Sequence, residues 1–248
     1  MLVTAKSTKQ YDELMTQYKD YIDTIDSLYK LNTNEEEKIS DIYSKIKANL
    51  IETNIITPSR VIKIISNACC YNSRFKQSYI SLAIKFFNEY HPTSIVKVPI
   101  YFDYFVFKEH GIIFSEKNKY KISTYKESEL YKAIIEDDAK LMSSIIDNEG
   151  FDSRKFIKSI LNPNPLLPGF LFELVCYHGA VNCFKLLITK YHPRISQFCL
   201  EYSFRSGIPD IMNECLKYQT PDYRYMMHAV KSHNIDFIGC PKVCLAQT

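Results

Sequence analysis

Apolar residues recur at spacings of three and four along most of the chain, and this periodicity predicts helices. The first such segment has a seam typical of an a/d heptad, formed by Tyr11, Leu14, Tyr18, Tyr21, Ile25 and Leu28. Acidic, basic and amide side chains occupy the other faces. Two interpretations follow: the seam is the buried stripe of an amphipathic helix, or it forms a coiled coil between two copies of the chain.

Start and stop signals place further helices in the first part of the chain. Asn34 is a candidate cap before the acidic run 35–37, and Thr57-Pro58 is a typical helix start. His91-Pro92 and Gly111 are stop signals. We therefore expect residues 1–115 to form an N-terminal domain of five packed helices. The polar run that follows predicts a linker over residues 116–128.

A repeated helix–turn–helix pattern begins after this linker. Its best-formed unit is Phe172–Ile188, FELVCYHGAVNCFKLLI, and units in the same register begin at Leu130, Leu200 and Met226. The turn position of the four units is held by Asp137, Gly179, Gly207 and His233. Repetition in one register predicts a short helical solenoid over residues 129–238, because neighbouring units then bury one another's apolar faces. The predicted fold class is all-α.

The register resembles that of the ankyrin repeat, whose helical core has the form L-x-L-A-A-x-x-G-H-x-x-V-V-x-x-L-L. The Thr-Pro-Leu-His opening is missing and the later units are short, so the repeats are degenerate. The phrases CYHGAVNCFKLL, LEYSFRSG, IMNECLKYQ and AVKSHNIDF, together with YKDYIDTIDSLYKL near the start, resemble an ankyrin family of trichomonad-type protists. In that family an N-terminal helical domain of unknown function precedes the repeats. The resemblance implies a non-enzymatic protein that binds an undetermined protein partner, and it carries no catalytic residues to transfer.

Partner contacts in ankyrin stacks come from the hairpins and from exposed positions just before the turn of each unit. By this resemblance the candidate partner-binding residues are Tyr177, His178, Arg205 and Lys231. Tyr177 and Arg205 are the leading candidates, since Tyr and Arg are frequent at binding hot spots. An adaptor or scaffold is the expected function. The alternative is a self-assembling structural protein that dimerises through the Tyr11–Leu28 seam.

Composition narrows the classes of partner and the compartment. The formal net charge is only +3, from 31 basic and 28 acidic side chains, so neither nucleic acid nor a membrane is expected as a partner. Lys117, Lys119 and Lys121 alternate in the linker and are expected to be solvated. Most of the eight cysteines occupy apolar helical positions, and the sequence has neither a secretory signal nor a Cys-x-x-Cys motif. These features favour a reduced, cytoplasmic setting.

The familiar signatures of catalysis and cofactor binding are missing from the sequence. No P-loop, Gly-x-Gly-x-x-Gly, His-Glu-x-x-His or Gly-x-Ser-x-Gly occurs, so we expect no enzyme and no cofactor. His228, His233, Cys240 and Cys244 are potential zinc ligands, but their spacing matches no strong finger pattern, and no metal site is predicted. Pro241 interrupts the last unit, so residues 239–248 are expected to be a divergent tail of a truncated paralogue or of a frame-shifted gene model.

Overall fold

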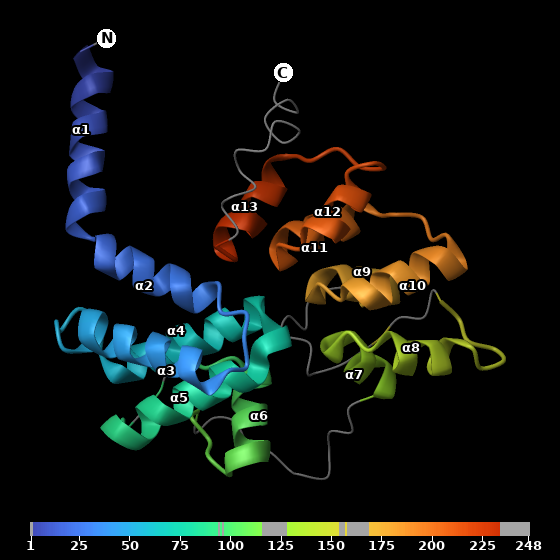
Figure 1. Ribbon diagram of the computed structural model, residues 1–248, viewed down its shortest axis with the longest axis horizontal. Coiled ribbons are helices and arrows are strands. Elements are labelled where there is room, and N and C mark those ends of the chain that lie inside the picture. Colours follow the sequence, from blue (N-terminus) through green and yellow to red (C-terminus); the bar gives the residue numbers. More distant parts are fainter. Residues whose placement is uncertain are drawn as a thin grey trace.

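A computed structural model describes residues 2–93, 95, 97–115, 128–153, 157 and 169–233, with side chains from residue 9 onward except at 223 and 224. Over these residues the chain is all-α, as the periodicity predicts (Figure 1). Several predictions concern residues outside the described ones: most of the linker, including Lys117, Lys119 and Lys121, the end of the last unit, and the tail with Cys240 and Cys244.

The N-terminal part of the chain consists of helices joined by short loops. These are α1 (Leu2–Gln17), α2 (Lys19–Tyr29), α3 (Glu36–Ile46) continued by a π-helical turn (Lys47–Ile51), α4 (Pro58–Tyr71), a 3-10 turn η2 (Ser73–Phe75), α5 (Lys76–Tyr90) and α6 (Ile100–His110). Among these elements α4 packs on α5, α2 and α6, and α3 packs on α2 and α5.

The heptad segment forms two helices where the periodicity predicts one. The chain bends at Tyr18, which has φ −104° and ψ 17°, and α1 extends away from the rest of the molecule (Figure 1). The bend follows from packing, since Ile25 and Leu28 of α2 are buried in the core whereas Tyr11 of α1 is 60% exposed. The interpretation as a buried stripe is therefore confirmed for the second half of the seam only.

Most of the predicted helix boundaries are confirmed, and one is wrong. Thr57 and Pro58 begin α4, His91 ends α5 at φ 42°, and Gly111 ends α6 at φ 69°. Asn34, however, does not cap α3: Glu35 is the N-cap residue, and the Asn34 side chain accepts a hydrogen bond from the Ser78 hydroxyl instead. A tertiary contact has replaced the local one.

The repeated units form helix pairs that lie side by side. The pairs are α7 (Glu129–Glu136) with α8 (Ala139–Ile146), α9 (Leu171–His178) with α10 (Val181–Tyr191), and α11 (Gln197–Ser206) with α12 (Pro209–Cys215), followed by α13 (Tyr223–Lys231). The first helices contact one another in the order α7, α9, α11, α13, and the second helices in the order α8, α10, α12.

The predicted turn positions share one backbone conformation. Asp137, Gly179, Gly207 and His233 have φ of 53°, 65°, 66° and 58°, all in the left-handed region. Glycine adopts this region without the steric cost that a Cβ incurs, and Asp and His are tolerated in single turns. The register derived from the sequence is therefore confirmed at all four turns.

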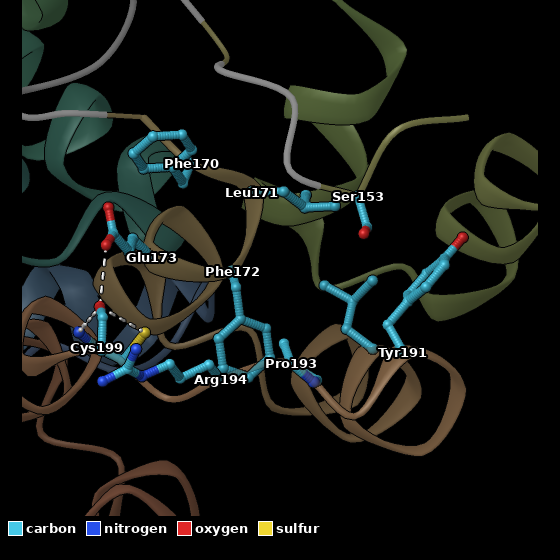
Figure 2. A pocket seen from close by; sticks show the side chains of 11 residues that line it. Ser153, Phe170, Leu171, Phe172, Glu173, Tyr191, Pro193, Arg194 and Cys199 are labelled. Carbon is cyan, nitrogen blue, oxygen red and sulfur yellow. Dashed lines mark hydrogen bonds between the residues drawn. The ribbon is translucent and has the colours of Figure 1, made fainter. Parts of the chain in front are cut away.

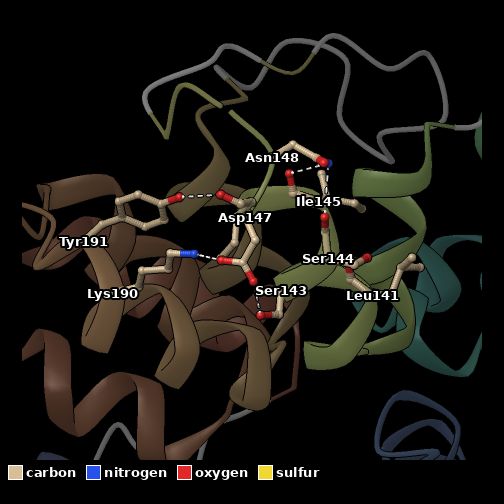
Figure 3. A network of polar contacts seen from close by, with 9 residues as sticks. Leu141, Ser143, Ser144, Ile145, Asp147, Asn148, Lys190 and Tyr191 are labelled. Atoms are coloured by element: carbon tan, nitrogen blue, oxygen red, sulfur yellow. Dashed lines mark hydrogen bonds and ion pairs between the residues drawn. The ribbon is translucent and has the colours of Figure 1, made fainter. Parts of the chain in front are cut away.

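A polar network links two successive pairs on the side of the second helices (Figure 3). Asp147, after α8, accepts hydrogen bonds from Lys190 of α10 and from Ser143. The hydroxyl of Tyr191 donates to the backbone carbonyl of Ile146 at 3.1 Å. These contacts fix the end of α10 against the end of α8.

The buried apolar residues form two cores that meet at α7. Tyr131 and Ile135 of α7 belong to the core of the N-terminal helices, whereas Ala133 and Ile134 belong to the core of the helix pairs. One short helix thus contributes opposite faces to both cores, so the first pair packs directly on the N-terminal helices.

Candidate functional site

The candidate partner-binding residues lie in a row where the first helices end. Tyr177 and His178 end α9, Arg205 lies in the last turn of α11, and Lys231 is the last residue of α13. Lys231 is exposed as expected. The expected exposure is wrong for Tyr177, His178 and Arg205, which are only 3%, 7% and 6% exposed.

The N-terminal helices cover these three residues. The guanidinium of Arg205 lies between the rings of Tyr71 at 4.4 Å and Tyr177 at 4.1 Å, and it donates a hydrogen bond to the backbone carbonyl of Cys70. A cation between two aromatic faces is stabilised by both ring quadrupoles, by about 1–2 kcal/mol per contact where water is excluded. Arg205 therefore joins α11 to the end of α4.

His178 makes a second connection between the two parts of the chain. Its Nδ1 is 2.7 Å from the Ser73 hydroxyl oxygen, and its Nε2 is 3.3 Å from the Tyr131 hydroxyl oxygen. Burial, together with the positive charges of Arg205 and Lys76, lowers the pKa of His178 to about 3. The ring is therefore neutral at physiological pH, with each nitrogen in contact with a hydroxyl that can donate or accept.

Asp137 at the first turn has a role that periodicity does not reveal. Its Oδ1 accepts hydrogen bonds from the backbone N–H groups of Asn182 at 2.8 Å and Cys183 at 3.0 Å. These are free N–H groups in the first turn of α10, whose own N-cap residue, Ala180, has no side chain that can accept. The carboxylate of one pair thus caps a helix of the next, and Arg74 of the N-terminal helices lies 3.9 Å away.

An opening remains beside Arg205, between the N-terminal helices and the last pairs. It has a volume of about 490 Å³ and is lined by Tyr29, Asn67, Cys70, Tyr71, Pro99, Arg205 and Lys231. Its charged lining residues, Arg205 and Lys231, are both basic. At the nearby end of α2, the Tyr29 ring stacks on His233 at 4.1 Å, and His233 Nδ1 lies 3.6 Å from an oxygen of Asp26. This opening is the accessible part of the predicted partner-binding face.

The cysteine thiols of the described part of the chain are buried between the packed helices. Burial raises the pKa of Cys70 and of Cys183 to about 12 and holds the pKa of Cys69 and Cys176 well above the usual range. A hydrogen bond with Cys176 lowers the pKa of Cys199, which is itself buried. Thiols in apolar surroundings are poor nucleophiles because the thiolate is the reactive form.

Neither a metal cluster nor a membrane-spanning helix is present among the described residues. No three His, Cys, Asp or Glu side chains there come close enough to hold a metal ion. His228 instead contacts the carboxylate of Glu201 at 2.7 Å, and His233 occupies its repeat turn. In the same part of the chain, each helix is too short or too polar to cross a bilayer.

Comparison with known proteins identifies one matching segment. Residues 191–240, which include α11, α12 and α13, match the sequence model of a domain of unknown function, DUF3447. No curated protein and no solved structure matches the chain significantly. The segment that contains α11, α12 and α13 is therefore similar to DUF3447.

Proposed function

We propose that the chain is a non-enzymatic protein-interaction module, an adaptor or scaffold of the cytoplasm, whose ankyrin-like helix pairs bind a protein partner. The observation that carries the proposal is the row of corresponding positions at the ends of α9, α11 and α13. Side-by-side first helices with identical left-handed turns present equivalent residues at regular intervals, which is how repeat proteins build extended binding surfaces. The free, buried cysteines of the described part are compatible with a reducing compartment.

The intramolecular contacts assign different roles to the four candidate residues. His178 and Arg205 hold the N-terminal helices in place, and Tyr177 stacks on Arg205. A partner meets Lys231 and the rim of the opening beside it. Arg205 contributes positive charge from the wall of that opening. A partner that presents acidic side chains here would complement both charges, and such complementarity steers association and selects partners.

Charge reversal at Lys231 tests the proposal. Full-length chain is used to capture partners from the native cell as wild type, as Lys231→Glu, and as Lys132→Glu, a matched control on the exposed side of α7. We expect at least one protein to be recovered equally by wild type and Lys132→Glu and about tenfold less by Lys231→Glu, in line with loss of a charged interface contact. Equal recovery of every partner by Lys231→Glu would remove this surface from consideration.

The exposed seam of α1 favours a second candidate function, self-assembly. Leu14 and Tyr18 are each 47% exposed, and Tyr11 is also exposed on the same seam. A helix of 16 residues is marginal in water unless its apolar side is packed, so a second copy of α1 would stabilise it. Multi-angle light scattering should give a dimer for wild type and for the control Gln17→Glu, and a monomer for Leu14→Glu. A wild-type monomer at all concentrations would contradict this candidate.

A further inference from the structure

A mostly apolar cavity lies at the end of α9 opposite to Tyr177 and His178 (Figure 2). It has a volume of about 440 Å³, and Leu171, Phe172, Leu187, Tyr191 and Pro193 supply its apolar walls. In the view of Figure 2, Glu173 and Tyr191 lie on opposite sides of Phe172. A volume of this size is within the range of about 300–1,000 Å³ that is common for ligand sites.

Glu173 lies in the wall of this cavity, and only one of its two carboxylate oxygens accepts a hydrogen bond among the described residues. The residue is 7% exposed, and its Oε1 accepts a hydrogen bond from the Ser196 hydroxyl at 2.9 Å. Its Oε2 is buried and has no hydrogen-bond partner within the part of the chain that the structure describes. Desolvation raises the pKa of Glu173, because burial disfavours the charged form, and the Ser196 hydrogen bond only partly opposes this.

A basic side chain of the protein lies close by but does not neutralise Glu173. Arg194 lines the same cavity, yet it is exposed, and no ion pair joins it to Glu173 among the described residues. An unpaired buried carboxylate is costly, so an apolar residue of similar size would serve the fold better. Residues that destabilise the fold in this way are expected at sites where they bind a ligand.

We propose that this cavity binds a primary ammonium group on an apolar stem, namely a lysine side chain in a peptide segment of the partner. The inference rests on the proposed function and gives the chemistry of one contact. The lysine methylenes pack on Phe172 and Tyr191, and the ammonium donates to Oε2 of Glu173. A rotation about the terminal torsion of Glu173, which is soft, turns Oε2 toward the cavity, and the rotation is small enough for Ser196 to keep its hydrogen bond to Oε1.

The geometry selects lysine over arginine. Ser196 already occupies Oε1, so a single carboxylate oxygen is open to a donor. An ammonium is a compact donor that one oxygen satisfies, whereas a guanidinium binds best to both oxygens at once. The apolar lining beside Glu173 favours apolar residues next to the lysine in the peptide.

Calorimetric titration of the full chain with short peptides tests the proposal. The probe is acetyl-Leu-Lys-Leu-amide, and its matched control is acetyl-Leu-norleucine-Leu-amide, which has the same stem without the ammonium. We expect the norleucine peptide to bind at least about tenfold more weakly, the loss typical of a hydrogen bond between charged groups. Binding of the lysine peptide should weaken as the pH is lowered from 8 to 5, because protonation of Glu173 removes its charge. Equal binding of both peptides would overturn the proposal.

Variants then assign the effect to the carboxylate. Glu173→Gln should weaken the lysine peptide about tenfold or more, while Glu136→Gln, an exposed control, should leave it unchanged. Glu173→Gln should also raise the melting temperature at pH 7, so that a loss of binding in a more stable protein reports on the ligand and not on folding. Wild-type affinity in Glu173→Gln would overturn the role of Glu173. If Glu173→Gln does not fold, the pH dependence of the wild type still decides.

Two further comparisons separate the source of the ammonium and the dependence on the proposed function. n-Hexylammonium is a free amine of similar length, and equal affinity for it and for the tripeptide would overturn the peptide source. Lys231→Glu should leave tripeptide binding unchanged, because Lys231 lies at the end of α13 and Glu173 at the start of α9. Loss of partner capture therefore tests the charged opening, and loss of tripeptide binding tests the cavity.

Discussion

Mild acid should destabilise the chain through one imidazole, that of His178. Burial lowers its pKa from 6.5 to about 3, so the folded chain keeps the ring neutral while the unfolded chain binds a proton. A group with a depressed folded pKa contributes its full stability above the unfolded pKa and loses it as the pH falls toward the folded one. The affected window therefore runs from about pH 6.5 down to about pH 3.

The magnitude follows from the two pKa values. Each unit of difference corresponds to about 1.4 kcal/mol, so the free energy of unfolding should fall by about 2 kcal/mol between pH 7 and pH 5. The loss should reach about 4 kcal/mol at pH 3, where the folded state is itself half protonated, and about 5 kcal/mol is its limit at lower pH. Losses of this size are a large fraction of the stability of an ordinary domain, about 5–15 kcal/mol.

Urea unfolding followed by circular dichroism at pH 7, 6 and 5 measures the effect. His178→Gln removes the titrating ring and keeps an amide that can contact Ser73 and Tyr131, so its stability should fall by about 2 kcal/mol less than that of wild type over this range. His192→Gln, at an exposed histidine, should behave as wild type. Carboxylates titrate in all three proteins and cancel in the comparison. An equal loss in wild type and His178→Gln would refute the reasoning.

Three substitutions test other contacts by urea unfolding at pH 7. Gly179→Ala should cost about 2–4 kcal/mol, because φ at this residue is +65° and an added Cβ would lie 2.7 Å from Cγ1 of Ile208. The control Gly111→Ala, at φ +69° with no atom within 4 Å of the added Cβ, should cost about 1 kcal/mol. Equal costs would contradict the clash with Ile208. Asp137→Gly keeps the left-handed turn but removes the side chain that caps α10, so it should cost about 1–2 kcal/mol of unfolding free energy. Asp137→Asn should cost less, and equal costs for the two variants would argue against a capping charge. Arg205→Met should cost about 2–4 kcal/mol by removing the cation between two tyrosine rings and its hydrogen bond, and a neutral result would show that Arg205 does not hold the N-terminal helices.

The parts of the fold that depend on neighbouring residues could be predicted from the sequence. The turn positions Asp137, Gly179 and Gly207 follow from local backbone preferences, and so do the start of α4 and the ends of α5 and α6. The bend at Tyr18 could not be predicted, because it arises where a distant core buries only half of a continuous seam.

The sequence predicted where the candidate residues lie along the helices, but not which residues pack against them. The repeat register places Tyr177, Arg205 and Lys231 at the ends of successive first helices, and the structure agrees. Periodicity within one segment carries no information on which remote surface packs against it, so the cover formed by Tyr71 and Ser73 was missed. One available signal was the occurrence of an aromatic and an arginine at equivalent positions, a pair suited to stacking as much as to binding a partner. Glu173 gave no signal, since an isolated glutamate in a helix is ordinary.

The cap that Asp137 provides for α10 also gives the array a direction. The acceptor belongs to the earlier pair and the N–H groups that it caps belong to the later one. The earlier pair therefore stabilises the start of the later pair through this contact. During synthesis Asp137 is made before α10, so its carboxylate is available when the new helix forms. A fragment that begins at α9 would lack Asp137 and therefore the cap of α10, whereas a fragment that ends after α8 would lose no cap by the truncation.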